Sequence, residues 1–266
     1  MLTLNHNQMV PFDKLYQLAE EQSENYKNAE PFAHGYYDDI FPVALLDKVI
    51  EEFELGEKKW REFESKYEKK LQMNQDCNLQ PITRALIHNL NSEPFLKFLS
   101  KLTGIDGLIP DPYLMGGGLH KIERGGKLGV HVDFNEHKGM GVYRRLNVLV
   151  YLNKDWFEEW GGHFELWDAD RKGCVTKLLP LFNRMAIFTT TSTSFHGHPV
   201  PLNCPEDRCR MSLALYYYTA NDRGDQAKKS HSTQFLTEDG KRDELKANNS
   251  LVAKVKRKVK KIIGRS

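Results

Sequence analysis

The stretch LGVHVDFN, residues 128–135, decides how the rest of this chain is interpreted. Its alternating pattern predicts a β-strand, and positions i and i+2 of a strand point to the same face of the sheet. His131 and Asp133 are therefore expected side by side. Imidazole and carboxylate are both ligands of transition metals, so the pair indicates a metal site. The alternative is a His–Asp pair that is only hydrogen-bonded, on a half-exposed strand.

The segments around this stretch form a series of short β-like runs. They extend from about residue 118 to Thr219 and are separated by Gly, Asn, Asp and Pro. The runs are LHKIERG, KLGVHVDF, RLNVLVYLN, HFELWD, VTKLLP, RMAIFTT and MSLALYYYT. This rhythm is typical of a jelly roll or sandwich rather than of alternating strands and helices. We therefore predict a mainly β fold with flanking helices.

The residues before 118 have a helical pattern instead. Apolar residues at helical spacing among Glu and Lys predict helices between Phe41 and Leu71 and between Ile82 and Leu102, the latter with a helix start at Ser92. After Thr219 the composition turns polar. We expect four parts: a helical region at 1–117 packing on the core, the jelly-roll core at 118–220, a polar linker at 221–250 and a basic tail at 251–266.

Composition excludes several classes of protein. The 266 residues are 40% hydrophobic, which suits a globular chain and neither a collagen-like nor a disordered one. The N-terminus lacks the pattern of a signal peptide, and no apolar run is long enough to span a bilayer. The four cysteines are scattered and do not suggest a disulfide framework. We therefore expect a reducing, cytoplasmic location.

The charge of the chain is uneven. Residues 241–266 hold ten Lys and Arg against two acids, so of the net charge of +2 residues 1–240 carry −6. Within the tail, LVAKVKRKVKKIIGRS places apolar residues at helical spacing opposite Lys and Arg. Such a helix can lie on an anionic membrane surface, here through 251–263, or remain a charged helix in solvent. Nucleic acid is not an expected partner, because no aromatic residues are interleaved for base stacking.

A metal site at His131 and Asp133 needs a third ligand. Two histidines and one carboxylate on one face of the metal are the arrangement of non-haem Fe(II) oxygenases. The segment IFTTTSTSFHGHPVPL offers His196 and His198, far downstream of Asp133. A rival pair with the same i, i+2 spacing is present in GGHFELWD, at residues 163 and 165.

An anion site is indicated next to the predicted metal site. In RCRMSLALYYYT, Arg210 and Ser212 share one strand face. An arginine that points into an apolar barrel is costly to bury unless it meets an anion, and its planar fork suits a carboxylate. The alternative is an ion pair at the strand end with Glu206 or Asp207.

Taken in order, these motifs carry a family resemblance. H-x-D, RRLNVLVYLN, W-G-G-H-F-E-L, P-L-F-N-R-M-A-I-F, F-H-G-H-P-V and R-x-S-L, over residues 118–219, resemble the 2-oxoglutarate- and Fe(II)-dependent oxygenases, in their prolyl 4-hydroxylase-like branch. The resemblance implies a double-stranded β-helix, the cupin-like form of the jelly roll. It also implies an enzyme that hydroxylates an unactivated C–H bond while 2-oxoglutarate is decarboxylated to succinate.

The resemblance also implies roles for particular residues. It makes His131, Asp133 and His196 the Fe(II) ligands, with His198 as a pocket residue or a less favoured ligand. Arg210 would bind the distal carboxylate of 2-oxoglutarate, with Ser212 as its companion. No catalytic acid or base beyond the metal ligands is implied, and ascorbate is a further candidate cofactor.

The sequence departs from the family pattern at one point. Many relatives carry a tyrosine before the Gly turn that leads into H-x-D, whereas LHKIERGGKL has none. Asn147 or Tyr151 on the central strand are candidates to replace its contact with 2-oxoglutarate.

The substrate is expected to be peptidyl, a sugar or a lipid-linked small molecule. The candidate loops for contacting it are 135–146 and 153–162, with Arg144 and Arg145 as contacts for an acidic substrate or as a solvated edge. Two rival functions remain: a cupin-type metal-dependent isomerase or epimerase, and a non-enzymatic binding module on the same fold.

Overall fold

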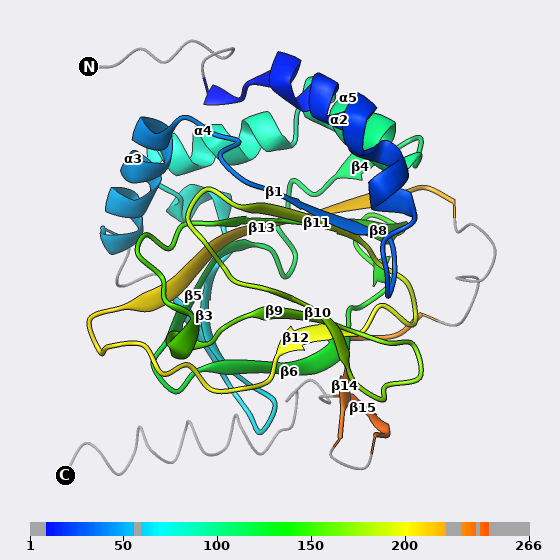
Figure 1. The fold of residues 1–266 in the computed structure, drawn as a ribbon. Coiled ribbons are helices and arrows are strands. Elements are labelled where there is room, and N and C mark those ends of the chain that lie inside the picture. Colours follow the sequence, from blue (N-terminus) through cyan, green and yellow to red (C-terminus); the bar gives the residue numbers. More distant parts are fainter. Residues whose placement is uncertain (1–8, 56–59, 222–229, 238–239, 245–266) are drawn as a thin grey trace.

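The computed structural model describes residues 9–55, 60–221, 230–237 and 240–244. Helices lie on one side of a curled sheet (Figure 1). Their bounds are α2 (Phe12–Lys27), α3 (Val43–Glu54), α4 (Pro81–Leu90) and α5 (Glu93–Thr103), with short 3-10 turns η2 (Asp76–Asn78) and η3 (Glu158–Trp160). Ser92 is the residue that precedes α5, so the predicted helix start is confirmed. No helix in the described ranges is long and apolar enough to cross a membrane.

The strands form a single antiparallel sheet that curls into two facing layers (Figure 1). One layer runs β1-β11-β8-β13-β5 and the other runs β6-β12-β9-β10, with β3 pairing β5 on one side and β6 on the other. The bounds are β1 (His34–Tyr37), β3 (Glu68–Met73), β5 (Gly118–Glu123), β6 (Lys127–Val132), β8 (Val142–Tyr151), β9 (Phe164–Trp167), β10 (Cys174–Leu178), β11 (Met185–Thr189), β12 (His196–His198) and β13 (Cys209–Thr219).

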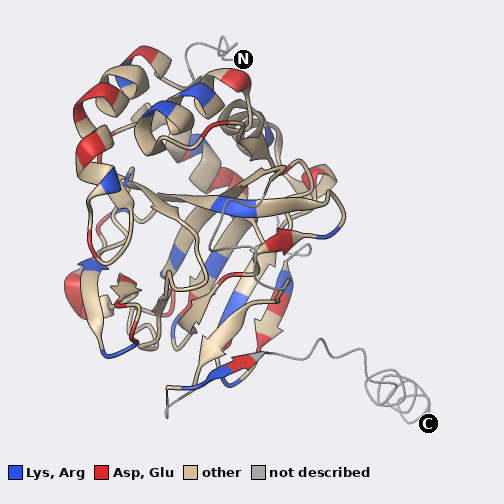
Figure 2. Ribbon diagram, turned by 90° about the vertical axis from the view of Figure 1, so that its right-hand side faces the viewer, with Lys and Arg blue, Asp and Glu red and all other residues tan. Residues whose placement is uncertain are grey.

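Shorter strands attach to the ends and edges of these layers. They are β2 (Arg61–Glu64) beside β3, β4 (Ile109–Pro110) beside β13, β7 (Glu136–His137) beside β8, and β14 (Gln234–Leu236) between β6 and β15 (Arg242–Glu244). The sheet is the mainly β architecture with flanking helices that the sequence predicts, and every predicted β-like run contains a strand. Lys, Arg, Asp and Glu are interspersed along the helices and strands (Figure 2).

The period-two alternation of the central strands separates two environments. On β8, Leu146, Val148 and Val150 belong to the core packed beneath the helices, together with apolar residues of α5. The intervening Asn147 and Leu149 line a cavity between the two layers of the sheet. Because alternate side chains of a strand point to opposite faces, one strand supplies both the apolar core and the wall of the cavity.

Two expectations about secondary structure are wrong. The helix predicted between Phe41 and Leu71 ends at Glu54, and residues 61–64 and 68–73 form the β2–β3 hairpin. The polar segment after Thr219 is not only a linker, because β14 pairs with β6. In both cases pairing with the sheet overrides a local pattern. The basic tail predicted at 251–266 lies outside the described residues.

Candidate metal and anion site

The predicted site residues meet in one cavity of about 480 Å³ between the two layers of the sheet. His131, Asp133 and His196 lie on its wall, and so do Arg210 and Ser212. The cavity therefore brings together residues separated by up to about 80 positions in the sequence, as a jelly roll does with strands distant in the chain.

His131, Asp133 and His196 form a compact cluster. Their ligand atoms all lie within 4.8 Å of one another, and both histidines are buried. His131 is on β6, Asp133 follows that strand directly, and His196 on β12 stands opposite His131 in the register of the two strands. Gly197 permits this pairing, since a Cβ there would lie 2.8 Å from the backbone oxygens of Leu128 and Gly129. The separation of three donor atoms is suited to a single metal ion.

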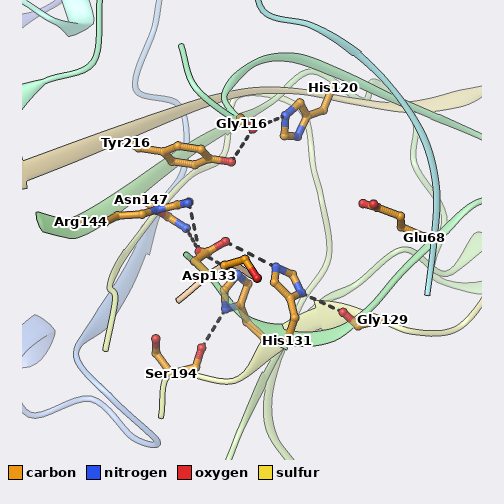
Figure 3. Close-up of polar contacts among 12 residues, drawn as sticks. Glu68, Gly116, His120, Gly129, His131, Asp133, Arg144, Asn147, Ser194 and Tyr216 are labelled. Carbon is orange, nitrogen blue, oxygen red and sulfur yellow. Dashed lines mark hydrogen bonds and ion pairs between the residues drawn. The ribbon is translucent and has the colours of Figure 1, made fainter. Parts of the chain in front are cut away.

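The hydrogen bonds of the two histidines turn the same nitrogen toward the cluster. The Nδ1–H of His131 donates to the carbonyl of Gly129 at 2.8 Å, and the Nδ1–H of His196 donates to that of Ser194 at 2.9 Å (Figure 3). Because a carbonyl oxygen only accepts, each Nδ1 carries the proton and each Nε2 keeps a free lone pair. Burial lowers the pKa of His196 to about 3. The ring is therefore neutral, the form that binds a metal.

Asp133 is held by two side chains from β8. Asn147 Nδ2 donates to Asp133 Oδ2 at 2.8 Å, and the Arg144 guanidinium lies 3.1 Å from the same oxygen (Figure 3). Arg144 is 1% exposed, and its Cζ sits 3.4 Å from the ring centre of Tyr216. Burial alone would raise the pKa of Asp133, yet the charge of the Arg144 guanidinium holds it well below its usual range. The carboxylate is thus charged and fixed in position.

Arg210 lies in the same cavity without an acidic partner. It is 5% exposed, its Nε donates to the carbonyl of Gly162 at 2.8 Å, and its Nη2 donates to the Tyr151 hydroxyl at 3.2 Å. Gly162 has φ +74°, and a Cβ there would lie 3.0 Å from Arg210 Cδ, so glycine lets the arginine pack closely. Among the described residues no carboxylate forms an ion pair with Arg210, so the predicted alternative with Glu206 or Asp207 is wrong.

The rest of the cavity wall was not foreseen from the sequence. One face of the β2–β3 hairpin lines the cavity, and so does His120 on β5. On the hairpin, Lys70 Nζ forms an ion pair with Glu68 Oε2 at 3.0 Å. Figure 3 shows Glu68 and His120 on the far side of the cavity from Asp133. The hairpin residues were not found from the sequence because its pattern predicts a helix here. Residues 61, 63, 70 and 72 share one face only when the segment forms two paired strands.

The loops expected to contact a substrate contribute little to the cavity. Of residues 135–146 and 153–162, only Arg144 lines it. Arg144 is neither a solvated edge nor an exposed contact, because it is buried against Asp133 and Tyr216. His163 and Glu165 do not belong to the cluster of metal-binding type. They lie near Glu158 and Lys177 respectively.

Comparison with known proteins agrees with this geometry. Residues 117–218 match the family model described as the 2OG-Fe(II) oxygenase superfamily. No curated protein matches the chain. A prolyl hydroxylase from Trichoplax adhaerens, solved with a hypoxia inducible factor peptide, is 17% identical with a TM-score of 0.56, covering 78% of this chain and 92% of its own.

Two bacterial structures share the fold as well. A Pseudomonas putida prolyl-4-hydroxylase is 13% identical with a TM-score of 0.54, covering 76% of this chain and 99% of its own. HygX from Streptomyces hygroscopicus, solved with nickel, 2-oxoglutarate and hygromycin B, is 10% identical with a TM-score of 0.52, covering 80% of this chain and 95% of its own. These likenesses establish the double-stranded β-helix fold. Residues 117–218 are in addition similar to the 2OG-Fe(II) oxygenase superfamily.

Proposed function

We propose that this chain is an Fe(II)- and 2-oxoglutarate-dependent hydroxylase in which His131, Asp133 and His196 bind the metal. Arg210 and Ser212 then bind the distal carboxylate of 2-oxoglutarate. One observation carries the proposal. Three donor atoms within 4.8 Å of one another line the same cavity as a buried arginine that pairs with no acid in the part of the chain that the structure describes. A cupin-type isomerase that takes no dicarboxylic co-substrate has no use for such an arginine, whereas a dicarboxylic co-substrate compensates its charge.

The residues of the chain would hold the metal ion and orient the groups that bind it. His131 and His196 present Nε2 because their Nδ1–H groups are engaged by backbone carbonyls. Asp133 keeps its charge because Arg144 and Asn147 bind one of its oxygens. When bound, Fe(II) and 2-oxoglutarate supply the oxidising power that breaks a C–H bond. Three protein ligands leave open positions at the metal for the co-substrate.

At the proposed anion-binding end of the cavity, Tyr151 contacts Arg210. Its hydroxyl accepts from Arg210 and retains its own proton, because burial raises the pKa of Tyr151 above its usual range. The proton is thus free to be donated to a carboxylate that Arg210 binds. We propose Tyr151, rather than Asn147, as the replacement for the tyrosine that is missing before His131, because Asn147 is engaged with Asp133.

The substrate would enter beside the β2–β3 hairpin. This wall of the cavity presents Arg61, Glu68 and Lys70 together with the ring of Phe63. Charged groups next to an aromatic ring favour a polar substrate with hydrogen-bonding groups, such as a peptidyl or sugar substrate, over a purely apolar one. We further propose a reducing, cytoplasmic location, supported by four cysteines that are all free.

The test is release of succinate and carbon dioxide from 2-oxoglutarate by anaerobically purified protein supplied with Fe(II) and air. We expect slow turnover in the absence of substrate. His131→Ala should abolish it through loss of the metal, and Arg210→Ala should reduce it through loss of the co-substrate. Absence of turnover, combined with an iron spectrum that does not change on addition of 2-oxoglutarate, contradicts the proposal.

A further inference from the structure

His198 is a buried histidine whose ring nitrogens have no hydrogen-bond partner among the described residues. Its exposed fraction is 3%, and both Nδ1 and Nε2 are buried and unpaired. Buried polar atoms are normally hydrogen-bonded, because leaving them unpaired after removal from water is unfavourable. The side chain lines the same cavity as the metal cluster and Arg210. The missing partner is therefore to be sought among molecules that enter this cavity.

The position of His198 separates it from the metal cluster. On β12 it pairs with Leu128, whereas His196 pairs with His131, so His198 lies farther along the strand. The cluster of donor atoms within 4.8 Å contains His196 and not His198. His198 therefore lies outside the three-donor cluster, in the cavity whose wall also holds Arg210.

We propose that His198 positions the co-substrate by donating a hydrogen bond from its ring N–H to the distal carboxylate that Arg210 binds. The inference rests on the proposed function, because it assigns a further contact to the same co-substrate. A neutral imidazole always carries one N–H, so the contact requires no positive charge on the ring. Hydrogen bonds to an ionised acceptor are stronger than those between neutral groups, and a carboxylate has lone pairs for both residues.

The contact would discriminate between ligands by their distal group. 2-Oxopentanoate has the same five-carbon 2-oxo acid skeleton as 2-oxoglutarate but ends in a methyl group. The two ligands share every interaction at the metal and differ only where Arg210 and His198 lie. A residue that acts on the distal carboxylate changes the affinity for 2-oxoglutarate and leaves that for 2-oxopentanoate unaltered.

The experiment is isothermal titration of the full chain loaded with Zn(II), which gives binding without turnover. 2-Oxoglutarate and 2-oxopentanoate are titrated into the wild type, His198→Phe, which keeps a ring without an N–H, and His198→Asn, which keeps a donor. His198→Leu is a second variant without a donor, in case the phenyl ring does not fit. His163→Phe is the matched control, because His163 lies outside the cavity lining. Thermal melting verifies that each variant is folded.

We expect His198→Phe and His198→Leu to weaken 2-oxoglutarate binding about tenfold, a change of about 1.4 kcal/mol. Binding of 2-oxopentanoate should stay the same, and His198→Asn should recover part of the loss. Equal weakening of both ligands, or no weakening of either, overturns the proposal. If the zinc-loaded wild type fails to bind 2-oxoglutarate at all, the proposed function itself is wrong, and this outcome is distinct from the other two.

Discussion

The cavity contains two buried arginines that are placed differently. Arg144 is 1% exposed, lies 3.1 Å from Asp133 and stacks on Tyr216. Arg210 is 5% exposed and donates only to neutral groups, the carbonyl of Gly162 and the hydroxyl of Tyr151. The charge of Arg144 is therefore compensated within the protein, whereas the charge of Arg210 is not.

We interpret the charge of Arg144 as part of the folded structure and propose that the charge of Arg210 binds a ligand. A buried ion pair is strongly destabilised when one partner is removed, because the other charge is left unpaired. A buried charge without a partner instead destabilises the protein until a ligand supplies the opposite charge. The charge of Arg144 is thus compensated by the protein itself, and we propose that the charge of Arg210 is compensated by a bound anion.

The largest expected effect is on the stability of the metal-free protein. Arg144→Met should lower the free energy of unfolding by about 3–5 kcal/mol, because it leaves Asp133 charged and unpaired. Arg210→Met should leave it unchanged or raise it, because it removes an uncompensated charge. Urea unfolding followed by circular dichroism measures both. Adding Asp133→Asn to Arg144→Met should recover part of the loss, and equal losses for the two single variants would contradict the distinction between the arginines.

A smaller effect on stability is expected for the gain that bound 2-oxoglutarate provides. At a 2-oxoglutarate concentration of 100 times Kd, binding should stabilise the zinc-loaded wild type by about 2.7 kcal/mol. Arg210→Met should lose this gain, since the distal carboxylate no longer meets a cation. Thermal melting with and without 2-oxoglutarate measures the gain. Arg171→Met, at an exposed arginine outside the cavity, is the control and should keep it; a ligand-induced shift that persists in Arg210→Met would show that the carboxylate binds elsewhere.

The third expected effect is a change of stability with pH, and it is the smallest of the three when taken per unit of pH. Burial, and then the charge of Lys70, lowers the pKa of His120 to about 3, whereas in the unfolded chain it is about 6.5. Between these values the unfolded state binds more protons than the folded state, so stability rises with pH, by about 1.4 kcal/mol per pH unit for this residue.

His120→Gln should therefore flatten the rise of stability between about pH 4 and pH 6. Urea unfolding at several pH values measures the slope. The result shows whether a histidine whose Nε2–H already donates to the carbonyl of Gly116 stays neutral beside the cationic end of the cavity. Parallel pH profiles for the wild type and the variant would contradict the depressed pKa.

The jelly-roll strands and the His131–Asp133 pair could be predicted because their signals are local, whereas the choice of His196 over His198 came from the family resemblance. The two-residue spacing of His131 and Asp133 places them on one face as soon as the segment is a strand. The β2–β3 hairpin could not be predicted, because its Glu- and Lys-rich sequence has helical spacing and its partners β5 and β6 lie about 50 residues away. Contacts at that separation override local preference.

The role of Arg144 was missed for a related reason. Its neighbours Arg145 and Tyr143 give the segment the composition of an exposed edge. Burial of Arg144 depends on Asp133 and on the rings of Phe134 and Tyr216, the last of which is 72 positions away. A single sequence does not reveal such a combination, whereas the unusual burial of Arg210 could be inferred because it follows from the strand pattern itself.

The insertion of β3 between β5 and β6 has a consequence for how the chain reaches its fold during synthesis. Strand β3 leaves the ribosome well before both of its partners, and β1 precedes its partner β11 by about 150 residues. Non-local pairing of this kind slows folding, because the ends of long loops must be brought together first. Strands β1 and β3 therefore stay unpaired until their partners have been synthesised, and the curled sheet closes only after most of the polypeptide has been made. A nascent chain that stops short of β13 lacks Arg210, so the arginine that we propose to bind the co-substrate is made only near the end of translation of the core.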